Sequence, residues 1–284
     1  MAGVGRRLQI VHRTGFRYAE VVEASFNEVR MTPLTEQGQM LLNHTLDVRP
    51  AAAVQSYQDY WGAHVEAFDV HVPHRLLEIV ATSTVDTAVS TPRTAGTFWS
   101  VVLEPLLQDR FAEFLVPTTY VDDPAADPAR SDIVEEMRRA DTPYDAAVTA
   151  VAAVRDRITY TPGITDVSTT AAEAWESRHG VCQDFTHTTL ALMRASRIPA
   201  RYVSGYLHTE EPTPGQTVTG ESHAWVEYWD DGWRAVDPTN DRSVGSAHVI
   251  VARGRDYADV PPLKGIYAGG QSEALGVTVE ITQL

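Results

Sequence analysis

The chain has 284 residues, of which 43% are hydrophobic and 21% are charged, and these values are ordinary for a globular protein. The length allows one large domain or two moderate ones, each with enough apolar residues for a core. Its 23 basic and 38 acidic residues give a net charge of −15. This acidity argues against nucleic acid or an anionic membrane surface as a partner, because both are bound by clustered Lys and Arg.

Cysteine usage and the N-terminal residues indicate the compartment. A single cysteine permits no intramolecular disulfide, which suits a reducing compartment. The first ten residues lack the apolar segment of a secretion signal, and no apolar run approaches the length of a membrane span. We therefore expect a cytoplasmic protein with no membrane partner.

The first part of the chain has the two-residue period of β-strands. Apolar residues alternate over 42–48 and 68–72, and Pro and Gly residues separate the runs as turns. The pattern extends over residues 8 to about 105 and predicts an antiparallel β domain at 1–122, as a small sandwich. A stretch rich in Pro, Asp and Ala at 118–130 is typical of a domain boundary.

The pattern then changes to helical and later returns to strands. Helices are expected in four segments: 131–140, which begins at Ser131, 141–158, 169–177 and 182–196. Strands are expected at 201–207, 223–229 and 233–237, with a long mobile loop at 211–220. We assign 131–260 to a second domain. The remaining segment, 261–284, contains a final strand at 276–281 whose sheet the sequence does not identify.

Cys182 is the only cysteine, and it follows Gly180 at the start of a predicted helix. Unpaired N–H groups and the helix dipole favour a thiolate at this position. A buried cysteine is nevertheless often inert. A nucleophilic role requires a histidine and an acidic residue from elsewhere in the fold.

His223 and Asp237 can supply these two groups. His223 begins one predicted strand and Asp237 ends the next, and an Asp231-Gly232 turn joins them. Antiparallel pairing would place the two residues almost opposite each other, with Cβ atoms within about 5–6 Å if they share a face. The acid could then orient the imidazole while its other nitrogen faces the sulfur. From the residues alone, a Cys-His-Asp triad and three unrelated structural residues both remain open.

Metal ligation has little support in the sequence. His71 and His74 flank Pro73, which disrupts regular geometry, and no thiol or acidic group adjoins them. The chain also lacks a helix-spaced His-Glu pair and a Gly-rich phosphate loop. We expect no metal and no other cofactor.

Several ordered motifs resemble the transglutaminase-like superfamily, namely GVCQDF at 180–185, IPARYVSGYL at 198–207, SHAWVE at 222–227 and VDPTN at 236–240. Three further segments resemble the bacterial members that carry an N-terminal β domain, namely DYWG at 59–62, PHRL at 73–76 and VARGRDYADV at 251–260. One departure is Ala63, where relatives often carry Asn; it touches a turn of the β domain.

The resemblance implies an α+β fold. In it, a papain-like core packs a nucleophile helix on an antiparallel sheet and follows a β-sandwich-like domain. It also implies Cys182 as nucleophile, His223 as general base and acid, and Asp237 as the orienting acid.

The donors that would stabilise an oxyanion are less defined. The backbone N–H of Cys182 is the natural first donor. Tyr160 and Trp175 precede the nucleophile and carry polar hydrogens. Of these two we favour Tyr160, and the reading that both are simply core aromatics stays open. Gln183 and Asp184 could cap the helix or contact substrate.

We therefore expect a cysteine-dependent amide- or peptide-bond hydrolase, or an acyl transferase, that works through a thioester acyl-enzyme on a peptide, protein or amide substrate. Hydrolysis is favoured over transamidation because many bacterial relatives look more like peptidases or amidases. The alternatives are a non-catalytic peptide-binding or assembly module and a metal-dependent hydrolase. The oligomeric state and the acyl group remain open.

Overall fold

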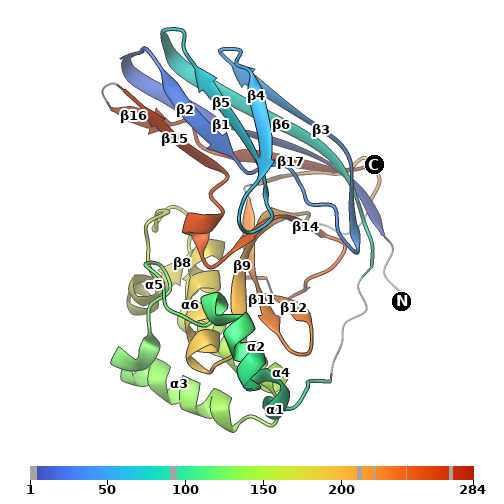
Figure 1. Ribbon diagram of the computed structural model, residues 1–284, viewed down its shortest axis with the longest axis vertical. Helices are drawn as coiled ribbons and strands as arrows, with labels where there is room; N and C mark the ends of the chain where they lie inside the picture. The colour runs from blue at the N-terminus through green and yellow to red at the C-terminus, as the bar shows by residue number, and fades with distance from the viewer. Residues whose placement is uncertain (1–4, 90–94, 210–212, 221, 241, 269–270) are drawn as a thin grey trace.

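The computed structural model describes residues 5–89, 95–209, 213–220, 222–240, 242–268 and 271–284. Figure 1 shows two parts: a β domain of long strands at the top, and a mixed core of helices and shorter strands below it. This arrangement confirms the predicted α+β fold with an N-terminal β domain.

Two antiparallel sheets form the β domain. The larger has the order β10-β17-β1-β6-β3, with β16 also paired to β1. Its strands are β1 (Arg6–Val22), β3 (Gln39–Arg49), β6 (His74–Thr87), β10 (Thr217–Gly220), β16 (Ser272–Ala274) and β17 (Thr278–Gln283). The smaller sheet, of order β15-β2-β5-β4, contains β2 (Ser25–Val29), β4 (Val54–Gln58), β5 (His64–Val70) and β15 (Leu263–Tyr267). Apolar residues of both sheets, such as Phe68 and Leu77, are buried in one shared cluster.

The C-terminal residues return to the β domain. The predicted final strand is confirmed as β17, which pairs with β1 so that Leu8 lies opposite Gln283. β10 pairs with the other edge of β17, with Val218 opposite Ile281. The predicted mobile loop at 211–220 is therefore wrong over 217–220, where β-branched residues fill a free sheet edge. Residues 211 and 212 of that loop lie outside the described chain.

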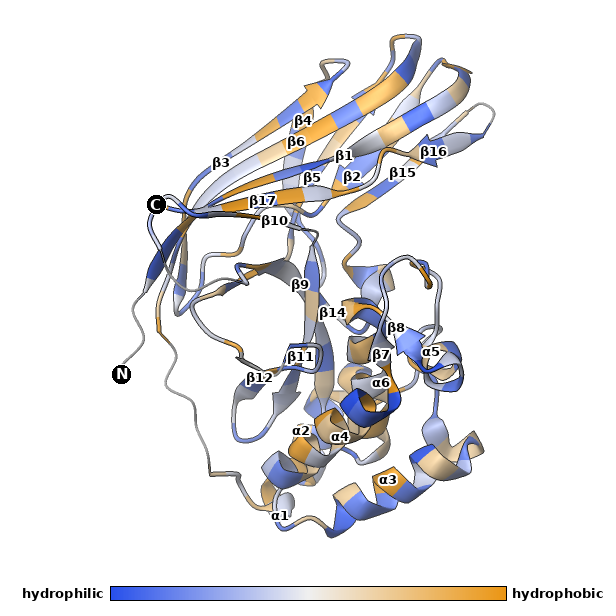
Figure 2. Cartoon of the chain, turned by 180° about the vertical axis from the view of Figure 1, so that it is seen from behind, coloured by the Kyte–Doolittle hydropathy of each residue, from blue (hydrophilic) through white to orange (hydrophobic). Residues whose placement is uncertain are grey.

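The core contains a third antiparallel sheet, of order β13-β12-β11-β9-β14. Its strands are β9 (Ala200–Leu207), β11 (His223–Trp229), β12 (Trp233–Asp237), β13 (Arg242–Ser243) and β14 (His248–Gly254). The surrounding helices are α3 (Pro128–Arg139), α4 (Pro143–Arg157), α5 (Ala171–Ser177) and α6 (Cys182–Ala195), and a two-stranded parallel ladder joins β7 (Thr159–Tyr160) to β8 (His179–Gly180). Figure 2 shows α6 between the other helices and the sheet. Every residue of α6 from Gln183 to Arg194 is buried.

Capping residues explain where the helices begin. The carboxylate of Asp127 accepts the backbone N–H of Arg130, so α3 begins at Pro128 rather than at the predicted Ser131. Two helices are not among the predicted elements. α1 (Trp99–Val102) lies within the segment whose pattern predicts strands, and α2 (Pro105–Arg110) follows at its end. Three short 3₁₀ turns complete the elements: η1 (Ala112–Phe114), η2 (Pro124–Ala126) and η3 (Tyr257–Asp259). None of the helices in the described residues is both long and apolar enough to cross a membrane.

Hydrogen bonds and charges attach the β domain to the core. The side chain of Gln39, in β3, donates to the carbonyl of Ile250 at 2.8 Å and accepts the N–H of the same residue at 2.7 Å. The guanidinium of Arg253 binds Glu36 at 2.6 Å and Glu227 at 2.8 Å. A continuous apolar cluster also runs from Leu8 in β1 to the core strands. The mixed core and the β domain therefore share one apolar cluster.

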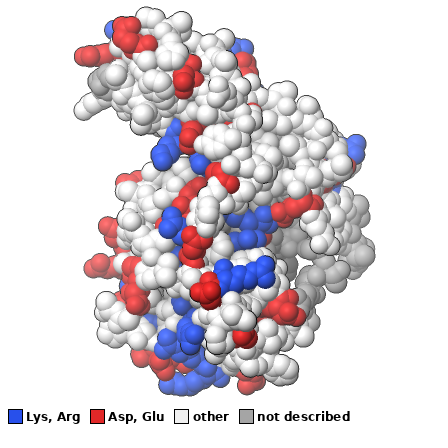
Figure 3. Space-filling model, in the orientation of Figure 1, with Lys and Arg blue, Asp and Glu red and all other residues white. Residues whose placement is uncertain are grey.

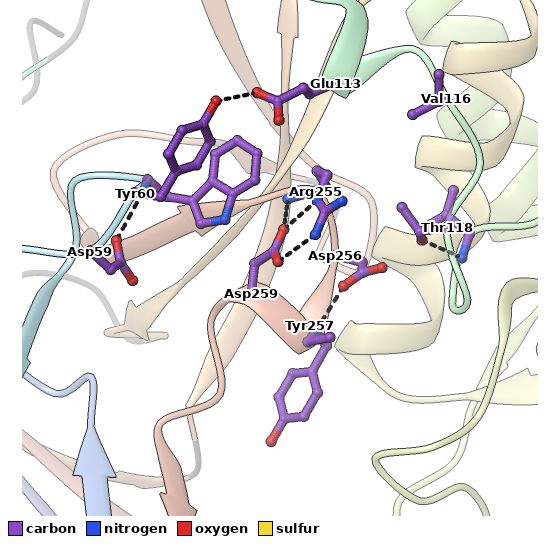
Figure 4. Close-up of polar contacts among 12 residues, drawn as sticks. Asp59, Tyr60, Glu113, Val116, Thr118, Arg255, Asp256, Tyr257 and Asp259 are labelled. Atoms are coloured by element: carbon purple, nitrogen blue, oxygen red, sulfur yellow. Dashed lines mark hydrogen bonds and ion pairs between the residues drawn. The ribbon is translucent and has the colours of Figure 1, made fainter.

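A second contact lies at the turn after β4. The hydroxyl of Tyr60 donates to Glu113 at 2.8 Å, and Arg255, which binds Asp259 at 2.9 Å, lies over the ring of Trp61 (Figure 4). The two parts are therefore joined at their surface as well as through the apolar interior. Acidic and basic side chains are interspersed on the face shown in Figure 3.

Gly205 allows close packing at the centre of the core sheet. A Cβ atom at this position would lie 2.0 Å from the carbonyl oxygen of Val249 and 2.7 Å from the ring of Trp225. Both neighbours are fully buried, so neither can easily move away.

We expect Gly205→Ala to lower the free energy of unfolding by about 2–3 kcal/mol or more, because it overpacks a buried backbone contact. Urea unfolding followed by circular dichroism measures this loss. Gly220→Ala is the matched control, since nothing lies within 4 Å of the Cβ that it adds. Equal unfolding midpoints for the two variants would contradict the packing argument.

Candidate active site

Cys182 is the first residue of α6, and its side chain is half-buried. The preceding Val181 is extended, and its carbonyl accepts the N–H groups of Asp184 and Phe185 at 2.9 and 3.1 Å. The N–H groups at Cys182 and Gln183 belong to the first turn, where a helix provides no internal acceptor. The sulfur is therefore placed at the positive end of a long buried helix.

Asp184 holds the backbone in front of Cys182. Its carboxylate accepts the N–H of Val181 at 2.7 Å and the hydroxyl of Thr165 at 2.8 Å. Burial raises the pKa of this carboxyl, against the effect of these two hydrogen bonds. A Cβ at Gly180 would lie 2.6 Å from that of Asp184, which explains the glycine two residues before the cysteine. Gln183 donates to the carbonyl of Val167 at 3.1 Å, so both flanking residues have structural contacts.

His223 and Asp237 meet as the sequence predicts. In the β11–β12 hairpin Val226 lies opposite Val236, so that Asp237 is diagonal to His223. The imidazole Nε2 of His223 lies 2.8 Å from Oδ2 of Asp237. Both side chains are enclosed, with exposures of 10% and 0%. Because Asp237 occupies Nε2, the second ring nitrogen, Nδ1, is the one that remains for an interaction with Cys182, whose side chain contributes to raising the pKa of His223.

Five hydrogen bonds satisfy the carboxylate of Asp237. Oδ1 accepts the backbone N–H groups of Thr239 and Asn240 at 3.0 and 3.1 Å. Oδ2 accepts from His223 at 2.8 Å, from the side-chain amide of Asn240 at 3.1 Å and from Nε2 of His248 at 3.3 Å. Burial opposes ionisation, but the hydrogen bonds from His223 and His248 outweigh it and hold the pKa of Asp237 well below its usual range. The group is a fixed buried anion.

This anion changes the protonation of His223. Burial opposes the charged imidazole, but the hydrogen bonds to Asp237 and Cys182 outweigh that cost and raise the pKa of His223 to about 10. An imidazole with this environment holds a proton firmly at neutral pH. It is therefore suited to receive the proton of the thiol and to keep it beside the sulfur.

Two residues of this site were missed in the sequence. Asn240 lies within the VDPTN segment, and its position three residues after Asp237 is the signal that could have identified it. His248 begins β14, which pairs with β9 on the side opposite β11. No local motif links His248 to the triad, because only the sheet order brings it near Asp237.

The oxyanion candidates differ in their surroundings. Tyr160 is 53% exposed and lies in the β7–β8 ladder beside Gly180, close in space to the start of α6. Trp175 is buried under Arg157, whose guanidinium lies 4.9 Å from its ring, and its Nε1 atom is enclosed. An enclosed donor cannot reach a substrate, so Tyr160 remains the side chain that could assist the backbone N–H of Cys182.

Metal-binding potential is confined to the same cluster among the described residues. His223, Asp237 and His248 bring one ligand atom each to within 4.8 Å of one another. Nδ1 of His248 accepts the N–H of Gly245 at 3.3 Å, which places the ring proton on Nε2. That atom would have to lose its proton to bind a metal, so this donor set suits a hydrogen-bond network better. His74 uses Nδ1 to donate to the carbonyl of Val72 at 2.8 Å.

Comparison with known proteins identifies the family of both parts of the chain. The model of the transglutaminase-like superfamily matches residues 131–238, and that of the bacterial transglutaminase-like N-terminal region matches residues 8–86. An uncharacterised protein of Mycobacterium leprae is 39% identical over 98% of this chain and 99% of its own length. A second, from Mycobacterium tuberculosis H37Rv, is 35% identical over 97% of this chain and 92% of its own.

Two further similarities are more distant. A Pseudomonas aeruginosa protein named protein-glutamine gamma-glutamyltransferase is 32% identical over 38% of this chain, which is 17% of that protein. A solved structure of a candidate cysteine protease from Cytophaga hutchinsonii superposes with a TM-score of 0.79 at 24% identity, and it covers 99% of this chain and 92% of the other. At this identity the superposition shows a shared fold.

We expect the imidazole of His223 to remain charged at pH 8 and to lose its proton near pH 10. Asp237→Asn should lower the pKa of His223 by about 1–3, because the substitution removes the buried anion. Nuclear magnetic resonance of ring-labelled histidine measures both values. His12 is an internal control, since burial lowers its pKa to about 4 and keeps it neutral in both proteins. A His223 that titrates near 6.5 in the wild-type protein would contradict the ion pair.

Proposed function

We propose, from the premise that this chain belongs to the transglutaminase-like superfamily, that it is a thiol-dependent enzyme which transfers acyl groups from amide or peptide bonds, chiefly to water. One observation carries the proposal: the ring of His223 is held at Nε2 by a fully buried Asp237, which leaves its other nitrogen for the thiol of Cys182, and Cys182 contributes to the raised pKa of His223. This is the arrangement that activates a thiol for attack on a carbonyl.

The first half of the reaction forms an acyl-enzyme. In the resting ion pair His223 already holds the proton of the thiol, and the thiolate of Cys182 adds to the carbonyl carbon of the substrate. The oxyanion that develops is stabilised by the backbone N–H of Cys182, with Tyr160 as the proposed side-chain donor. The C–N bond then breaks as His223 returns its proton to the leaving amine. A thioester on Cys182 remains.

The second half releases the acyl group. A water molecule gives a proton to Nδ1 of His223 and attacks the thioester, and the sulfur leaves as a thiolate while His223 keeps the proton, which restores the ion pair. A carboxylic acid is the product, and the enzyme returns to its initial state. An amine in place of water would give transamidation by the same steps, so both outcomes share one intermediate.

The proposed substrate class is a peptide, a protein or a simpler amide. Two similarities support it, without extending the names of those proteins to this one. The Pseudomonas protein is named for acyl transfer from glutamine, and the Cytophaga structure for proteolysis. Both reactions begin with attack of a thiol on an amide carbonyl.

We expect iodoacetamide to label Cys182 near neutral pH about tenfold faster, or more, than it labels a free thiol. His223→Ala should remove most of this difference, because the proton acceptor is lost. Mass spectrometry of the whole chain reports one site, since Cys182 is the only cysteine. Slow labelling that His223→Ala leaves unchanged would contradict a nucleophilic Cys182.

Trapping the intermediate tests the reaction itself. We expect a peptide library, quenched in acid during turnover, to leave an acyl group on Cys182, and its mass to identify the group that is transferred. Adding a primary amine distinguishes hydrolysis from transamidation by the product formed. Peptides that bind without any adduct at Cys182 would instead indicate a binding module.

Chelation tests the metal-dependent alternative. We expect EDTA to leave both the labelling rate and amide hydrolysis unchanged, because the proposed steps use only side chains and water. Dialysis against buffer alone is the control. Activity that is lost in EDTA and restored by zinc would overturn the thiol mechanism.

A further inference from the structure

We propose that His248 is a positioning residue of this site, and that its imidazole holds the carboxylate of Asp237 in the orientation that His223 requires. This inference rests on the proposed function, because it assigns a role within the same thiol-activating network. The role falls to a strand, β14, that carries no other member of the network.

The contacts of His248 define its protonation. Nε2 lies 3.3 Å from Oδ2 of Asp237, and Nδ1 accepts the backbone N–H of Gly245. Only the tautomer with its proton on Nε2 satisfies both partners. Its side chain is 2% exposed, so water does not compete for either nitrogen. His248 is therefore a fixed donor aimed at the carboxylate.

The surrounding rings keep that donor in place. The indole of Trp225 is fully buried and lies edge-on to His248, with ring centroids 5.2 Å apart. The same indole stacks on His223 at 5.9 Å. The centroids of the two imidazoles are 6.2 Å apart, so the three rings pack in a triangle and both imidazoles reach one carboxylate. The indole therefore contacts both imidazoles and limits their rotation.

His223 and His248 share one oxygen of Asp237, and this links the position of His248 to that of His223. His223 and His248 approach Oδ2 from β11 and β14, the strands on either side of β9. Rotation of the carboxylate about its Cβ–Cγ bond would break both hydrogen bonds at once. Without His248 the carboxylate loses one of these restraints. The imidazole of His223 would then be held less firmly against Cys182.

The test compares iodoacetamide labelling rates of Cys182 in the full chain for two variants. His248→Phe keeps a ring but removes the donor, and His248→Gln retains an N–H group that can reach Asp237. We expect His248→Phe to slow labelling by about tenfold, the loss that removal of one hydrogen bond to a charged group produces. We expect His248→Gln to restore the rate to within about threefold of wild type. Recovery by Gln would not follow from a role in ring packing alone.

Tyr206→Phe provides the matched control. Tyr206 lies in β9 of the same sheet, and its hydroxyl forms a buried hydrogen bond with the imidazole of His12 at 3.0 Å. The substitution removes this hydrogen bond and leaves the contacts among Cys182, His223 and Asp237 intact. We expect its labelling rate to equal that of wild type. Rates for His248→Phe that match wild type, or for His248→Gln that match His248→Phe, would overturn the positioning role. Slow wild-type labelling that His223→Ala does not change would instead reject the proposed function.

A measurement on the wild-type protein keeps the proposal testable if His248→Phe does not fold. Nitrogen-15 resonance of labelled histidine identifies which ring nitrogen carries hydrogen. We expect His248 to be protonated at Nε2, with a proton resonance that moves in Asp237→Asn. A His248 with no proton on Nε2 would overturn the proposal.

Discussion

A carboxylate with no access to solvent must have its charge balanced by neighbouring groups, and the architecture of the core follows this requirement at Asp237. The five donors come from His223, the turn after β12, and His248. An isolated anion in a protein interior is costly, whereas an anion that accepts several hydrogen bonds is stable. The hairpin, the turn and β14 must therefore all be in place before the imidazole of His223 has a fixed orientation.

The β domain contributes to this arrangement through the strand that carries His248. Gln39 makes a pair of hydrogen bonds to the backbone of Ile250, two residues after His248. Glu36 and Glu227 hold Arg253 further along β14. These buried polar contacts fix one position of β14 relative to the β domain, because a shift along the strand would leave a buried charge unpaired. The β domain is thus a structural support of the site in addition to being a separate sandwich.

The three residues of the proposed triad could be predicted from the sequence because local patterns place them. A glycine before a helix start located Cys182, and an Asp-Gly turn predicted the pairing that joins His223 to Asp237. His248 was inaccessible for a physical reason. Its partner is reached through the order of strands in the sheet, and no period or spacing along the chain encodes that order. The same limit applies to β10, whose pairing partner lies about sixty residues later in the chain.

The pairing of β10 with β17 has a consequence for the order in which the protein becomes complete during synthesis. β10 ends at Gly220, shortly before His223 begins β11, and its partner strand extends to Gln283. Domains fold from the N-terminus as the chain leaves the ribosome, but this edge cannot form until its last strand emerges. A growing chain can therefore contain Cys182, His223 and Asp237 while the strand leading into His223 still lacks its anchor. The segment that leads into His223 is therefore anchored only after β17 has been synthesised and has paired with β10.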